Sequence, residues 1–319
     1  MVKTQSSQDF DKYWEEVRQE YYKKIGNKEK VDEWVDYSIK LYKPFNRVFM
    51  PHTMMWQLYV QKKRMIKDNQ HLWFLFVGRK GGEGKSTLAK HVLHYLDPSF
   101  AEDARIVNSY KALIECMNTE KFVKFNDNPA ILMDEADPTI HMASKEGTKL
   151  RRILTKVRHL NQMVGLCVND LSDVPSFVYK LFSGLIFLDN KKGDHRFWYW
   201  NSNEEYCGIT ILDDIRKDYK NEKHAVFQKK APLAIIGHEN FSKDTPYFDE
   251  KEYIKRKEHD IHSDMQQYLY SSSNKKSKCG QTMTLKEFAK SLWNQNYGGH
   301  EIAKMLHLHP TTIYKWVKQ

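Results

Sequence analysis

The sequence predicts an α/β fold in which a parallel sheet lies between helices, with a helical region before it and a small all-α domain after it. An apolar run at 72–77 precedes a glycine-rich segment and then an amphipathic run, which is the order of a strand, a phosphate-binding turn and a helix. Further apolar runs at 129–133, 163–168 and 185–188 are typical of buried strands. Because helical stretches alternate with these runs, the sheet is expected to be parallel.

Residues 1–69 are predicted to form a helical N-terminal region. Phe10, Trp14 and Val17 recur at helical spacing, and 52–68 form a further candidate helix. We expect the aromatic side chains of this region to contribute to the core or to subunit contacts.

The glycine-rich segment has the composition of a phosphate-binding loop. The candidate ligand-binding residues are Gly81, Gly82, Gly84, Lys85, Ser86 and Thr87. Glycines let backbone N–H groups point at phosphates, the lysine would reach the β- and γ-phosphates of ATP, and Ser86 would hold Mg²⁺. The usual spacing places glycine where Arg79 stands, and Gly78 lies one position earlier. The loop is therefore predicted to be one residue longer at its entrance. The alternative is a surface glycine loop that binds nothing.

Polar residues follow the next two predicted strands. The run at 129–133 ends in Asp134 and Glu135, and the run at 163–168 ends at Asn169. We predict that Asp134 binds the metal, that Glu135 is the catalytic base and that Asn169 positions the attacking water. The alternatives are a solvated acidic turn after the first strand and a turn cap at Asn169.

The core is predicted to span 70–205. A mixed, partly helical extension follows at 206–270, and a serine- and lysine-rich linker at 271–283. Within the core, residues 177–182 are predicted to form a helix and 196–200 a further strand.

Residues 284–319 are predicted to form a helix-turn-helix domain. The expected buried set is Ile302, Ala303, Leu306, Leu308, Ile313, Trp316 and Val317. Pro310 suits the first turn of the last helix, where a backbone N–H would be unpaired in any case. The residues expected to face DNA are Thr311, Thr312, Tyr314, Lys315 and Lys318, with Lys304 as a further phosphate contact. The alternative is a three-helix module that binds another protein.

Charge and composition agree with a polyanionic partner. The net charge is +10, and the sequence pI is about 9.1. Residues 271–319 hold eight lysines and two acidic residues, although a basic tail can also be a solubilising surface. No run of 18 apolar residues exists, the N-terminus has no signal-peptide pattern, and the four cysteines are far apart. We therefore expect a cytoplasmic protein with free thiols and no membrane contact.

The motifs of the core resemble those of P-loop ATPases of the catalytic-glutamate class, which place an extra strand between the phosphate-loop strand and the acidic strand. The segment from Gly81 to Ser86 is similar to the AAA+-like superfamily 3 helicases in replication proteins of small circular single-stranded DNA viruses and plasmids. The C-terminal segment resembles the helix-turn-helix domains of resolvases and transposases, with His307 where the turn often has glycine. No His-x-His pair of the accompanying nickase domain lies upstream of residue 70.

These resemblances imply a P-loop NTPase fold and a DNA-stimulated ATPase that uses ATP and Mg²⁺. They also imply a homo-oligomeric ring, such as a hexamer, that binds DNA in the cytoplasm, the host's if the element is viral. A basic residue of a neighbouring subunit would complete each site; Lys180 and Arg196 are the trans-acting candidates, and Arg151, Arg152 and Arg158 are further ones.

A helicase or initiator for the DNA replication of a virus, plasmid or other mobile element fits these features best. Three alternatives stay open. They are an ATP-switched DNA-binding regulator or transposition helper, a motor that packages or transfers duplex DNA, and a small-molecule kinase with an appended DNA-binding domain.

Overall fold

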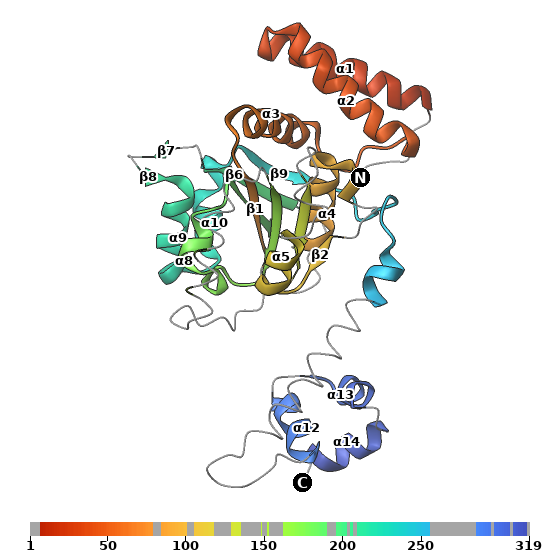
Figure 1. Ribbon diagram of the computed structural model, residues 1–319, viewed down its shortest axis with the longest axis vertical. Coiled ribbons are helices and arrows are strands. Elements are labelled where there is room, and N and C mark those ends of the chain that lie inside the picture. The colour runs from red at the N-terminus through yellow and green to blue at the C-terminus, as the bar shows by residue number, and fades with distance from the viewer. Residues whose placement is uncertain are drawn as a thin grey trace. The chain divides into compact units, whose positions relative to one another are not determined.

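A computed structural model of the chain consists of two compact units, Met1–Phe248 and Asp249–Gln319 (Figure 1). The residues that the structure describes are 7–78, 84–100, 105–117, 129–134, 148, 152, 162–189, 196–202, 205–206, 209–255, 285–294, 297–306 and 309–317. None of the helices within these ranges is long and apolar enough to cross a membrane.

The first unit begins with three helices, as predicted: α1 (Ser7–Ile25), α2 (Lys28–Tyr42) and α3 (His52–Asp68). Their aromatic side chains form core, since the Trp34 ring contacts Trp14, Tyr21 and Trp56 edge-on or tilted. The indole N–H of Trp34 also donates to the Tyr95 hydroxyl, 3.0 Å away, on the helix that follows the phosphate loop. The N-terminal helices are therefore packed onto the core rather than held apart from it.

The central sheet has seven strands in the order β2-β3-β4-β1-β5-β6-β9. The strands are β1 (Leu72–Gly78), β2 (Ile106–Val107), β3 (Ala130–Met133), β4 (Met163–Val168), β5 (Gly184–Asp189), β6 (Arg196–Asn201) and β9 (Ile236–Asn240). The first five in this spatial order run parallel, as predicted, whereas β6 is antiparallel to both β5 and β9. A separate pair, β7 (Glu205–Tyr206) and β8 (Ile209–Thr210), forms a small antiparallel sheet.

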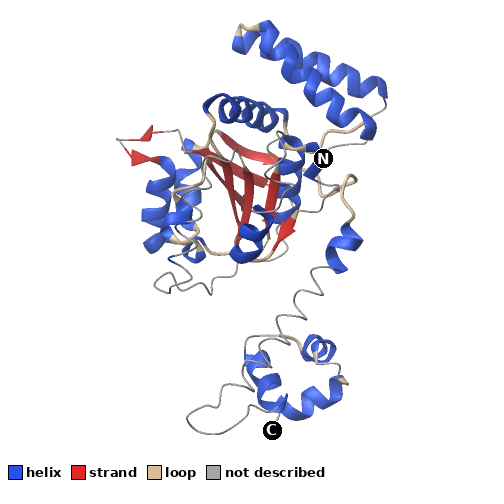
Figure 2. Cartoon of the chain, viewed as in Figure 1, coloured by secondary structure: helices blue, strands red, loops and turns tan. Residues whose placement is uncertain are grey.

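Helices cover both faces of the sheet (Figure 2). The remaining helices of the unit are α4 (Lys85–Leu96), α5 (Tyr110–Met117), α8 (Ser176–Tyr179), α9 (Ile211–Glu222) and α10 (Ala225–Lys230), with short 3₁₀ turns η1 (Lys43–Phe45), η2 (Pro98–Phe100), η4 (Leu171–Asp173) and η6 (Ala231–Leu233). On β1, Trp73, Leu75 and Val77 belong to the core cluster shared with α5 and α8 to α10. Phe74 faces Tyr199, whose hydroxyl is bonded to Gln61 of α3. Burial on both faces explains why the strand is apolar at every position.

One helix is shorter than predicted. Residues 177–182 were expected to be helical, but α8 spans only Ser176–Tyr179. The chain turns after Tyr179 because the Ser183 N–H donates to the Trp73 carbonyl across 2.8 Å, which aligns β5 with β1.

Besides the described helical residues 250–255, the second unit contains the helices α12 (Leu285–Asn294), α13 (Gly299–Met305) and α14 (Pro310–Val317). Their small core consists of Ala289, Leu292, Ile302, Ala303 and Ile313. Gly299 is required for packing here, because a Cβ at this position would lie 2.6 Å from Cζ of Tyr314. Pro310 begins the last helix, as predicted from its missing N–H.

Candidate functional site

The carboxyl ends of β1, β4 and β3 lie side by side at one edge of the sheet. β4 is hydrogen-bonded to β1 on one side and to β3 on the other. The segment after β1 leads to Lys85, the residue after β3 is Asp134, and the residue after β4 is Asn169. The sheet therefore gathers polar side chains that lie far apart in the sequence.

The first contact at this edge joins Ser86 to Asp134. The Ser86 hydroxyl donates to Oδ1 of Asp134 across 2.6 Å. Asp134 is 6% exposed, and its backbone N–H donates to the Val107 carbonyl at 2.9 Å, which fixes the end of β3. A hydroxyl and a carboxylate at this separation offer the hard oxygen ligands that Mg²⁺ prefers, so these residues fit a magnesium site.

The second contact joins Lys85 to Asn169. The Lys85 ammonium donates to Oδ1 of Asn169 across 2.7 Å, and Lys85 is only 8% exposed. Lys85 is the first residue of α4, whose N-cap Gly84 has φ +87°, a conformation that favours glycine. The α4 N-terminus adds its positive dipole end to the lysine charge, so the site attracts anions.

Two carboxylates stabilise the strands that carry the site, one at the amino end of β3 and one beside Asn169 at the carboxyl end of β4. Asp97, at the end of α4, accepts from the Ala130 N–H at 2.9 Å and pairs with Arg105 at 2.8 Å, which anchors the start of β3. Beside Asn169, burial alone would raise the pKa of Asp170, but hydrogen bonds from Ser172 and the charge of Lys223 hold that pKa below its ordinary value.

Several predicted residues lie outside the described part of the chain. They are Gly81, Gly82, Glu135, Arg151, Arg158 and Lys318. Thr87 is described and half-buried in the first turn of α4. The roles assigned to these residues stay predictions.

The two trans-acting candidates lie near different edges of the sheet. Arg196 is exposed and paired in register with Asp189 at the carboxyl end of β5, the edge where Asn169 lies. Lys180 is exposed and precedes Leu181, whose carbonyl is 2.9 Å from His71 just before β1. Of the two, Arg196 therefore lies at the end of the sheet where β1 leads into the phosphate loop.

Sequence reasoning missed the turn between α9 and α10. Nε2 of His224 lies 3.3 Å from the backbone carbonyl of Asn169. Nζ of Lys223 lies 3.7 Å from Asp170 and 3.2 Å from the Ser172 hydroxyl. No motif marks these two residues, because their contacts depend on how α9 folds back against the end of β4.

The last helix of the second unit presents polar side chains to solvent. Thr311 and Lys315 are exposed, and Thr312 is half-buried. Tyr314 lies against Trp293 and His300, with ring centroids 5.9 and 6.0 Å away. The Tyr314 ring thus contributes to packing between the helices, and its contact with DNA stays a prediction.

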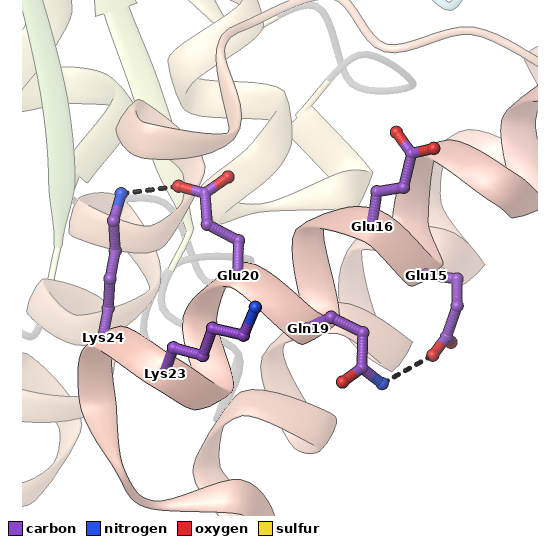
Figure 3. A pocket seen from close by; sticks show the side chains of 6 residues that line it. All are labelled: Glu15, Glu16, Gln19, Glu20, Lys23 and Lys24. Carbon is purple, nitrogen blue, oxygen red and sulfur yellow. Dashed lines mark hydrogen bonds and ion pairs between the residues drawn. The ribbon is translucent and has the colours of Figure 1, made fainter.

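A shallow hollow on the surface of α1 is lined by charged and polar side chains (Figure 3). Lys24 donates to Glu20 at 2.5 Å, and Gln19 donates to Glu15 at 2.8 Å. Because these groups pair along one helix, we interpret the hollow as an ordinary solvated helix face.

Comparison with known protein families shows a similarity in the C-terminal segment. A family model described as "Putative ATPase subunit of terminase (gpP-like)" matches residues 285–319. The matched residues contain α12, α13 and α14 and include none of the phosphate loop. A search of curated proteins found no match.

Two solved structures are similar in outline. One is the N-terminal domain of zonular occludens toxin from Neisseria meningitidis, at 14% identity over 58% of this chain and 97% of that chain, with a TM-score of 0.36. The other is the flagellar accessory protein FlaH from Methanocaldococcus jannaschii, at 12% identity over 45% of this chain and 81% of that chain, with a TM-score of 0.26.

Proposed function

We propose that this chain is an ATP-hydrolysing enzyme that acts on DNA for a virus, plasmid or other mobile element. The observation that carries the proposal is the pair of contacts at one sheet edge, Ser86 with Asp134 and Lys85 with Asn169. A phosphate-loop lysine and serine, each bonded to the residue that follows a strand of the sheet, are the kinds of groups that phosphoryl transfer requires.

Each residue has a part in this proposal. Ser86 and Asp134 hold Mg²⁺, which when bound neutralises charge on the phosphates. Lys85 binds the β- and γ-phosphates, Asn169 orients the attacking water, and Glu135 accepts its proton. A basic residue from a neighbouring subunit, with Arg196 or Lys180 as candidates, completes the site in an oligomeric ring.

The C-terminal unit supplies the link to DNA. Its residues match a family of terminase ATPase subunits, and Thr311 and Lys315 are exposed on α14. Exposed hydroxyls and ammonium groups on one helix are the donors that contact phosphates and base edges. We propose that α14 docks the enzyme on duplex DNA.

Two candidate functions for this enzyme are each favoured by one observation. The terminase match of the tail favours a motor that packages or transfers duplex DNA. The likeness of the phosphate loop to superfamily 3 helicases favours a replicative helicase or initiator. Both forms use the same site and differ in what the subunits do to DNA.

A pair of displacement assays distinguishes these forms. A helicase separates a labelled strand from a duplex, whereas a duplex motor strips a third strand from a triplex and leaves the duplex intact. Lys85→Ala serves as the inactive control, and Lys63→Ala, which changes an exposed lysine on α3, serves as the matched surface control. ATP hydrolysis without either displacement would favour the ATP-switched regulator, and the absence of hydrolysis would contradict the proposal.

A further inference from the structure

We propose that His224 is a positioning residue that fixes Asn169 for ATP hydrolysis, an inference that rests on the proposed function. Nε2 of His224 lies 3.3 Å from the Asn169 backbone carbonyl, and the Asn169 side chain accepts from Lys85 at 2.7 Å. The carbonyl can only accept, so this hydrogen bond requires the tautomer with the proton on Nε2, the atom that also lies 3.3 Å from the Tyr219 hydroxyl. Asn169 is thus held from two sides.

Three aromatic side chains pack around the His224 ring. The Tyr219 ring contacts it edge-on with the ring centroids 5.4 Å apart, and the ring centroids of Phe187 and Phe227 each lie 6.2 Å from that of His224. Phe187 and Phe227 stack on each other at 4.1 Å with an interplanar angle of 16°. Because Phe187 belongs to β5 and is aligned with Val77 of β1, these contacts connect the His224 ring to the strand that leads into the phosphate loop.

The turn that carries His224 also contacts the residues that follow Asn169. Lys223, just before it, has φ +51° and ψ −136°, a conformation that favours glycine and costs a lysine free energy. In this conformation its side chain reaches the Ser172 hydroxyl at 3.2 Å and the Asp170 carboxylate at 3.7 Å. The turn therefore contacts three of the four residues from 169 to 172.

This arrangement has a specific consequence for catalysis. Asn169 is exposed, so its amide would be free to reorient if the backbone at the end of β4 could move. His224 removes that freedom from a position that does not itself reach Lys85 or Ser86 in the described structure. We therefore expect His224 to affect the turnover of bound ATP more than its binding.

The test compares His224→Leu with His224→Gln, whose amide N–H can replace the imidazole donor. His224→Leu is expected to lower kcat about 10-fold with little change in KM for ATP, and His224→Gln to recover most of the rate. Lys229→Gln, which breaks an exposed pair with Glu222 on the neighbouring helix, is the matched control and is expected to keep the wild-type rate.

A double-mutant cycle separates positioning from general damage to the fold. In an Asn169→Ala background, His224→Leu should cause no further loss of kcat, because its effect acts through Asn169. Wild-type kcat in His224→Leu, or an equal loss in both backgrounds, would overturn the inference. A wild-type protein that does not hydrolyse ATP would instead contradict the proposed function.

Discussion

Lys85 and Asn169 are 84 positions apart in the sequence, yet Nζ of the lysine lies 2.7 Å from Oδ1 of the asparagine. The contact exists because β4 is inserted between β1 and β3. It joins the start of α4 to the end of β4, so a change at either residue alters the same edge of the sheet.

Replacing Lys85 should impair nucleotide binding and hydrolysis. In Lys85→Ala, the ammonium proposed to bind the phosphates is lost, and we expect ATP hydrolysis to fall by about 100-fold or more. Binding of a fluorescent ATP analogue and steady-state hydrolysis are the measurements. Lys63→Ala, on an exposed helix face, should behave as wild type. Unchanged nucleotide binding and turnover in Lys85→Ala would refute the assignment of the phosphate loop.

The Ser86–Asp134 pair should control the dependence on magnesium. Removing the hydroxyl in Ser86→Ala, or the carboxylate charge in Asp134→Asn, should raise the Mg²⁺ concentration needed for half-maximal activity by about 10-fold or more. A magnesium titration of the hydrolysis rate measures this. Asp244→Asn, which changes an exposed carboxylate paired with Arg47, is the control. Identical magnesium curves for Asp134→Asn and wild type would show that the carboxylate does not hold the metal.

The strands of the site could be predicted because they are buried on both faces and therefore apolar throughout. The apolar runs that end at Asp134 and Asn169 correspond to β3 and β4. The contact of His224 with Asn169 could not be predicted, since it arises from the return of α9 to the sheet edge and leaves no local pattern. The same holds for the packing of Tyr314 on Gly299, because helical spacing alone placed Tyr314 on the outer face.

Two buried histidines on α4 should make the stability of the first unit depend on pH. His91 is bonded to Tyr247 and to the Ser242 carbonyl, and His94 stacks on Tyr247 at 3.8 Å. Burial lowers the pKa of each to about 4 from an ordinary value of 6.5. Between these values the unfolded chain binds more protons than the folded chain, so the free energy of unfolding falls as pH drops from 6.5 toward 4.

The measurement is denaturant unfolding at several pH values in this window. Two such groups contribute a slope of at most about 2.7 kcal/mol per pH unit. His94→Phe keeps an aromatic ring against Tyr247 but cannot titrate, so its stability should fall less steeply with acid. Parallel curves for His94→Phe and wild type would contradict the contribution of His94.

Removal of residues 280–319 should affect DNA binding far more than basal ATP hydrolysis. Five of the eight lysines of residues 271–319 leave with this segment, together with α14, and we expect duplex affinity to fall by about 100-fold at low salt. Within the full chain, Lys315→Gln should weaken binding to all DNA sequences. It should also reduce the slope of the logarithm of the binding constant against the logarithm of the salt concentration by about one. Fluorescence anisotropy with labelled duplex measures both. Equal duplex affinity with and without the tail would refute its docking role.

The most direct test of a DNA-coupled ATPase is the steady-state rate of ATP hydrolysis by wild type and Glu135→Gln, without DNA, with single strands and with duplex. We predict that DNA stimulates the wild type and that Glu135→Gln binds ATP but does not turn it over, because the proposed catalytic base is missing. Hydrolysis that is indifferent to DNA, or undiminished turnover in Glu135→Gln, would contradict this account.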